Sequence, residues 1–151
     1  MFKKILACLD GSSLAEQILP YAAEEALRFD SKVVLLRVMD VPSTVAWIQG
    51  TDPDANIVTE ESQREENEAE AYLESLATPL RAKGLDVEAV IMHRVGADEA
   101  ILDYAEKNGV ELIAMTTRGR SGLVRAVLGS VADSVLRTSG LPVLVIRPQE
   151  L

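Results

Sequence analysis

Five short apolar segments, separated by stretches with helical periodicity, constrain the fold of this chain more than any other feature. Most are nearly continuous in valine, isoleucine and leucine, which is typical of parallel strands buried on both faces. The predicted strands are Lys3–Leu9, Lys32–Met39, Val87–His93, Glu111–Met115 and Pro142–Arg147. Because helical stretches separate most of them, we expect right-handed crossovers and an α/β fold with a parallel sheet.

Capping signals place the first helices. Ser13 followed by Glu16 fits a capping box, and an apolar stripe behind it consists of Leu14, Ile18, Ala22 and Leu27. Asp98 is predicted to cap a later helix that contains Ile101, Leu102 and Ala105.

The last helix has a start signal and a stop signal. Ser130 followed by Asp133 is a second capping-box pattern, ahead of Val131, Val135 and Leu136. We expect this helix to end near Gly140, since glycine suits the left-handed residue after a helix and Pro142 cannot continue it.

A long connection, Val41–Ile57, precedes a long acidic helix. Its glutamates are Glu60, Glu61, Glu65, Glu66, Glu68, Glu70 and Glu74. We interpret them as a solvated face near the positive end of the helix dipole, with a partner-docking surface as the alternative. The connection carries Trp47, which could pack under the loop, cover a ligand or meet a partner, and loops of this length are often functional.

Length and composition favour one globular domain spanning residues 1–151. The chain has 151 residues and is 48% hydrophobic. No apolar run approaches the ~20 residues of a membrane helix, and Asp10 and Gly11 interrupt the first apolar stretch too early for a signal peptide. Cys8 is the one cysteine, so no disulfide framework is expected. We therefore expect a cytoplasmic protein without membrane insertion.

A local positive segment stands out against the acidic whole. The net charge of −9 argues against nucleic-acid partners, whose phosphates need a positive field. From Leu112 to Ala132 the chain has no acidic residue but contains Arg118, Arg120 and Arg125, together with Gly119, Gly122 and Gly129. Gly129-Ser130 at a helix start forms a natural anion site. The segment suits a phosphate chain; the alternative is a capped helix after a glycine-rich loop with solvated arginines.

The expected location of a ligand is where the winding of the sheet reverses. In open parallel sheets ligands bind beyond the carboxyl ends of the strands at this point. Strand one ends in Cys8-Leu9-Asp10-Gly11-Ser12, and its partner ends in Met115-Thr116-Thr117. Asp10 is the better functional candidate, whereas Cys8 is expected to be a small buried hydrophobe and His93 a structural or exposed residue.

Several other nucleotide and phosphate motifs are missing. The chain contains no Walker loop, and where a dinucleotide fingerprint would follow strand one it has only Asp-Gly-Ser-Ser. A phospho-acceptor receiver domain would need an acidic cluster, but Asp10 stands alone.

The segment Met115–Ala132 resembles the signature loop of universal stress proteins, Gly-x2-Gly-x9-Gly-Ser or Thr. Gly119, Gly129 and Ser130 match it in spacing, and Thr116 replaces its first glycine. Ile5–Ser12 resembles the opening strand of the family and Leu141–Pro148 its closing strand, so the resemblance covers essentially the whole chain.

This resemblance implies an adenine nucleotide alpha hydrolase-like fold, an open five-stranded parallel sheet in the order 3-2-1-4-5 with helices on both faces. It implies binding of ATP, or of AMP or ADP, with or without Mg²⁺. Asp10 would touch the ribose or adenine, Cys8 and Leu9 would line the base pocket, and Val38 and Met115 would lie at the base. The ribose and phosphates would be surrounded by Thr116, Arg118, Gly119, Gly129, Ser130 and Val131.

Three hypotheses for the function remain open at this point. The first is a cytoplasmic stress-response protein that binds an adenine nucleotide as a regulatory or sensory ligand. The second is slow ATP hydrolysis or autophosphorylation at Ser130 or Ser121, although the sequence shows no dedicated general base or metal–carboxylate pair near the loop. The third is a nucleotide-free interaction module. The resemblance also implies a homodimer through the edge strand Val143–Arg147.

Overall fold

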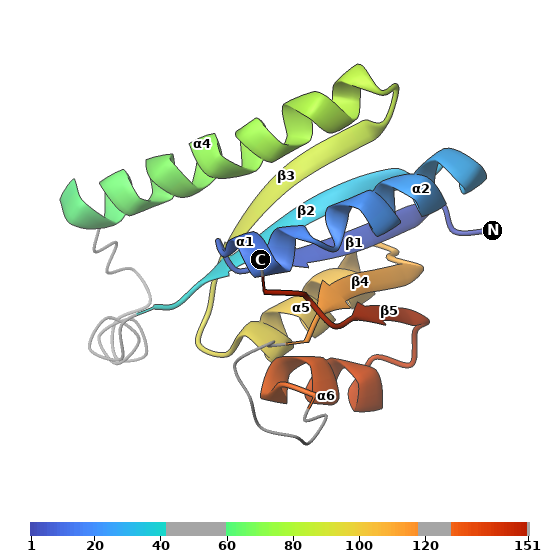
Figure 1. The fold of residues 1–151 in the computed structure, drawn as a ribbon. Coiled ribbons are helices and arrows are strands. Elements are labelled where there is room, and N and C mark those ends of the chain that lie inside the picture. The colour runs from blue at the N-terminus through green and yellow to red at the C-terminus, as the bar shows by residue number, and fades with distance from the viewer. Residues whose placement is uncertain (42–59, 118–127, 151) are drawn as a thin grey trace.

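A five-stranded parallel sheet forms the centre of the computed structural model, which describes residues 1–41, 60–117 and 128–150 (Figure 1). The strand order is β3-β2-β1-β4-β5, as expected. The strands are β1 (Lys4–Leu9), β2 (Lys32–Met39), β3 (Asp86–His93), β4 (Leu112–Thr116) and β5 (Val143–Ile146). Each bound lies within one residue of its predicted position.

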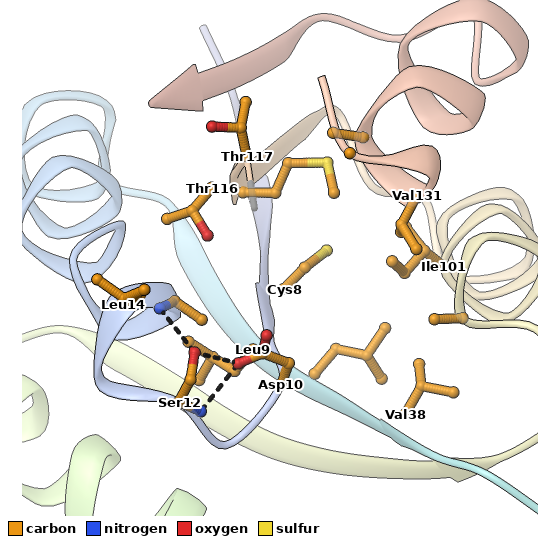
Figure 2. A pocket seen from close by; sticks show the side chains of 16 residues that line it. Cys8, Leu9, Asp10, Ser12, Leu14, Val38, Ile101, Thr116, Thr117 and Val131 are labelled. Atoms are coloured by element: carbon orange, nitrogen blue, oxygen red, sulfur yellow. Dashed lines mark hydrogen bonds between the residues drawn. The ribbon is translucent and has the colours of Figure 1, made fainter. Parts of the chain in front are cut away.

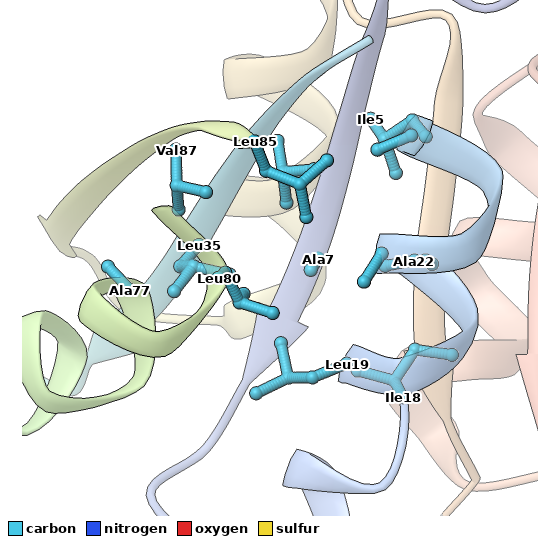
Figure 3. Close-up of a cluster of buried hydrophobic side chains, with 14 of the residues drawn as sticks. Ile5, Ala7, Ile18, Leu19, Ala22, Leu35, Ala77, Leu80, Leu85 and Val87 are labelled. Atoms are coloured by element: carbon cyan, nitrogen blue, oxygen red, sulfur yellow. The ribbon is translucent and has the colours of Figure 1, made fainter. Parts of the chain in front are cut away.

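Helices cover both faces of this sheet, which confirms the predicted α/β architecture. One face carries α1 (Ser13–Glu16), α2 (Leu19–Phe29) and α4 (Glu60–Ala82), and the other carries α5 (Ala97–Lys107) and α6 (Ser130–Thr138) (Figure 1). Because successive side chains of a strand point to opposite faces, Leu35 and Leu36 belong to different cores. Figure 3 shows the first core, in which Leu80 from α4 and Ile18 beside α2 pack over Ala7 of β1.

All three predicted N-caps are displaced by one or two residues. The cap of α1 is Ser12, not Ser13, because Ser12 is extended and its hydroxyl oxygen accepts from the Ala15 N–H at 3.1 Å. The cap of α5 is Gly96, so Asp98 lies inside the first turn. The cap of α6 is Gly129, so Ser130 is the first helical residue and forms no capping box. Gly140 takes the left-handed conformation just after α6, as predicted.

The apolar stripe of the first helical region was only partly correct. Leu27 is 52% exposed, and the buried positions are Ala15, Ile18, Leu19, Ala22, Ala23 and Ala26. The region is divided into α1 and α2, and Pro20 lies in the first turn of α2. The alanines on the buried face let α2 lie close to the sheet. Leu27 lies outside this face and is exposed to solvent.

The acidic helix is confirmed as α4, and its glutamates are exposed or half-buried. Ala69, Leu73, Ala77 and Leu80 form its buried stripe. The exposed His93 lies 3.5 Å from Glu66 across the α4–β3 contact. No helix among the described residues is long and apolar enough to cross a membrane. The predicted connection Val41–Ile57, apart from Val41 itself, lies outside the described residues, as does Trp47.

Candidate functional site

A cavity of about 440 Å³ lies where the winding of the sheet reverses between β1 and β4 (Figure 2). The carboxyl ends of β1, β2 and β4 form its floor, and the first turns of α1, α5 and α6 surround it. Its volume falls within the range of about 300–1,000 Å³ that is usual for small-molecule sites. Its position is the one that the strand pattern predicted for a ligand.

Most of the predicted site residues line this cavity. They are Cys8, Leu9, Asp10, Val38, Met115, Thr116, Gly129 and Val131. Ser130 is exposed beside the cavity and does not line it. Arg118 and Gly119 lie outside the described residues.

Other lining residues were missed by the sequence reasoning. These are Ser12, Leu14, Ala15, Leu36, Ala97, Ile101, Thr117 and Ala132. Leu36 could have been predicted as a lining residue, because it lies two residues from Val38 and therefore on the same face of β2. Helical spacing also puts Ala97 and Ile101 on one face of their helix. The sequence does not show where this face lies, because only the fold brings the start of α5 to the end of the sheet.

A tight turn presents Asp10 to the cavity. Asp10 Oδ1 accepts hydrogen bonds from the Ser12 N–H at 2.8 Å and from the Ser12 hydroxyl at 2.5 Å (Figure 2). Gly11 between them has φ of +86°, a conformation that L residues rarely adopt. One carboxylate oxygen is therefore held by the turn, and Asp10 is the one charged side chain among the described lining residues.

The cavity has a polar and an apolar side. Figure 2 shows Asp10, Ser12 and Thr116 on one side, next to Leu14, and the apolar Val38, Ile101 and Val131 on the other, with Cys8 between them. Cys8 is half-buried and lines the cavity, as the family resemblance implied. Burial raises the pKa of its thiol to about 12, so the sulfur is uncharged near neutral pH.

The start of α6 offers hydrogen-bond donors to the cavity. Gly129 caps this helix without a side-chain hydrogen bond, and Gly129, Val131 and Ala132 line the cavity. The first N–H groups of an α-helix lack intrahelical acceptors and carry the positive end of its dipole. An anionic group in the cavity would find partners at this end.

The start of α5 differs because a carboxylate already occupies it. The Ser134 hydroxyl of α6 donates to Asp98 Oδ2 at 2.7 Å. This bond is the largest cause of the lowered Asp98 pKa, and the N–H groups of Glu99 and Asp98 also lower it. The first turn of α5 therefore already holds a negative charge, which disfavours an anionic ligand at this helix start.

A model of the universal stress protein family matches residues 1–147. The chain belongs to this family.

Relatives of this universal stress protein cover nearly its whole length. A universal stress protein of Methanocaldococcus jannaschii is 31% identical over 153 residues, which cover 97% of this chain and 83% of the relative. The universal stress protein YxiE of Bacillus subtilis is 31% identical over 149 residues, which cover 97% of this chain and 100% of the relative.

Solved structures of universal stress proteins share the fold. Protein MJ0577 of Methanocaldococcus jannaschii superimposes with a TM-score of 0.78 at 28% identity, covering 100% of this chain and 99% of that one. An Archaeoglobus fulgidus universal stress protein in complex with dAMP has a TM-score of 0.65 at 23% identity, covering 97% and 98%. A universal stress protein in complex with cAMP has a TM-score of 0.68 at 18% identity, covering 98% of each chain.

Proposed function

We propose that this universal stress protein binds an adenine nucleotide in the cavity between β1 and β4, as a regulatory ligand of the stress response. The observation that carries the proposal is a single cavity that combines an apolar side, a fixed carboxylate and the start of a helix whose N–H groups no side chain caps. A purine base, a sugar and a phosphate need these three environments in this combination.

Each part of the nucleotide has a proposed place. The base lies against Cys8, Leu9, Val38 and Met115, where the neutral thiol and aliphatic side chains exclude water. Asp10 accepts hydrogen bonds from ribose hydroxyls through its carboxylate, and Thr116 faces the sugar with its hydroxyl. The phosphate meets the N–H groups at Gly129, Ser130 and Val131. Arg118 and Gly119, which lie outside the described residues, stay predicted phosphate ligands.

The ligands of two structural neighbours support an adenine nucleotide. Those neighbours hold cAMP and dAMP, each of which has an adenine base and one phosphate. For this chain we propose ATP, AMP or ADP, with Mg²⁺ arriving on the polyphosphate. In that case the phosphate oxygens would supply ligands to the metal.

The assembly and the setting complete the proposal. The protein is proposed to act as one domain in the cytoplasm and to form a homodimer through the outer edge of β5. The Ile113 N–H donates to the Pro142 carbonyl and the Thr117 N–H donates to the Ile146 carbonyl. By alternation along β5, Val143 and Val145 therefore direct their backbone groups away from β4. Those groups are available to a second copy of the strand.

Calorimetric titration tests the proposal. AMP, cAMP and ATP with Mg²⁺ are titrated into the wild type, into Val38→Trp, which fills the base side, and into Leu27→Trp, a matched control on the exposed part of α2. We expect binding to the wild type and the control and none to Val38→Trp. Undetectable wild-type binding at millimolar nucleotide would refute the proposal.

A further inference from the structure

Arg37 lies behind the turn that presents Asp10. It belongs to β2, where it is in register with Leu9 at the end of β1. A methyl group built on Gly11 would lie 3.0 Å from Arg37 Nη2 and 3.1 Å from Cζ. These distances are shorter than ordinary van der Waals contact, so the guanidinium packs directly against the backbone of the turn.

A tyrosine also contacts the guanidinium of Arg37. Arg37 Cζ lies 5.5 Å from the centroid of the Tyr72 ring, a cation–π distance. The Tyr72 hydroxyl donates to Glu16 Oε1 at 2.8 Å, which joins α4 to the end of α1. We call Arg37, Tyr72 and Glu16 the brace. It contacts the turn at Gly11 and the helix that follows it at Glu16.

Arg37 interacts through the packing of its planar guanidinium and not through an ion pair. Among residues 1–41, 60–117 and 128–150 its guanidinium has no salt-bridge partner within 4.0 Å, and its side chain donates no hydrogen bond. Its side chain is half-buried and does not line the cavity. A planar, weakly hydrated guanidinium suits this position better than an ammonium does.

We infer that Arg37 is a positioning residue for the nucleotide site. By packing on Gly11 it keeps the Asp10–Ser12 turn in the conformation that directs Asp10 toward the ligand's ribose. Binding groups need this kind of support because a site that is about 1 Å too loose loses much of its affinity. The inference rests on the proposed function, since it concerns how the same cavity recognises the sugar.

Two other roles of Arg37 make different predictions. An attraction between its charge and the phosphate would act on AMP but not on adenosine, and it would persist without Asp10. A purely structural contribution would lower the melting temperature without coupling to Asp10. A positioning role acts on adenosine and AMP alike and disappears when Asp10 is absent.

The experiment is a double-mutant cycle measured by calorimetry with adenosine and AMP. The proteins are the wild type, Arg37→Ala, Arg37→Lys, Asp10→Ala and Asp10→Ala combined with Arg37→Ala. Arg28→Ala is the matched control, because Arg28 pairs with Glu24 on the exposed face of α2. Arg37→Lys keeps the charge, so it provides a folded variant if Arg37→Ala unfolds.

We expect Arg37→Ala and Arg37→Lys to weaken both ligands by the same factor, about tenfold. In the Asp10→Ala background the loss of Arg37 should have no further effect, and Arg28→Ala should match the wild type. Unchanged affinity in both Arg37 variants, a loss confined to AMP, or an equal loss without Asp10 would overturn the inference and leave the proposed function standing. If the wild type binds neither ligand, the proposed function is refuted, and with it the inference that rests on it.

Discussion

The Ser12 hydroxyl connects the Asp10 carboxylate to the first turn of α1. It donates to Asp10 Oδ1 at 2.5 Å, and its oxygen accepts from the Ala15 N–H at 3.1 Å. One side chain thus caps a helix and orients the charged group of the cavity. The stability of α1 and the geometry of the site therefore depend on the same residue.

Replacing Ser12 by alanine should lower both stability and nucleotide affinity. Loss of an N-cap costs about 1 kcal/mol, and Asp10 loses one of its two partners in the turn. Urea unfolding and calorimetry with AMP measure the two effects. Ser13→Ala is the matched control, because Ser13 is exposed and is not the cap. Equal stability of the two variants would contradict the assigned cap.

Cys8 should react slowly with iodoacetamide at pH 8 in the folded protein. Its pKa is raised to about 12 by burial, so almost no reactive thiolate is present, whereas an unfolded cysteine has a pKa near 8.5. Mass spectrometry of timed samples with and without urea follows the alkylation. The prediction is wrong if the folded protein reacts as fast as the unfolded chain.

The Ser134–Asp98 bond should make stability depend on acid pH. The Asp98 pKa is lowered in the folded state, chiefly because the Ser134 hydroxyl donates to its carboxylate. A lowered pKa contributes stability above the unfolded value near 3.9, and this contribution is lost as pH falls through the folded value. We expect Ser134→Ala to be less stable than the wild type at pH 7 and the difference to narrow below pH 4. A difference that stays constant in urea titrations at both pH values would argue against this assignment.

Two proline variants in β5 should separate assembly from folding. Val145 directs its N–H away from β4, so Val145→Pro removes a donor from the outer edge and should give a folded monomer. Leu144 directs its N–H toward β4, so Leu144→Pro should destabilise the sheet itself. Light scattering and circular dichroism distinguish these results. A wild type that is monomeric at working concentration would contradict the proposed homodimer.

The strands and the location of the site could be predicted because their signals are local and redundant. Continuous apolar segments identify parallel strands, and the carboxyl ends of β1 and β4 follow from their bounds. Cys8, Asp10, Met115 and Thr116 could therefore be placed at the cavity from the sequence. The order of the strands came from the resemblance to the family, and the structure confirms it.

The caps and the supporting residues could not be predicted in this way. Ser12 and Ser13 are equally good capping residues, and the choice depends on which one is extended after the Gly11 turn. Gly129 is the N-cap of α6 in place of Ser130, because the backbone leaves the extended conformation and becomes helical one residue earlier than predicted. Arg37 and Tyr72 lie 35 positions apart in the sequence, and only the packing of α4 on the sheet brings them together.

The most direct test of the account is a crystal structure of the protein with AMP. We expect the base between Val38 and Met115, a ribose hydroxyl on Asp10, and the phosphate at the N–H groups that begin α6. A cavity that stays empty at millimolar AMP, or AMP bound elsewhere on the protein, would contradict the proposal that this site holds an adenine nucleotide.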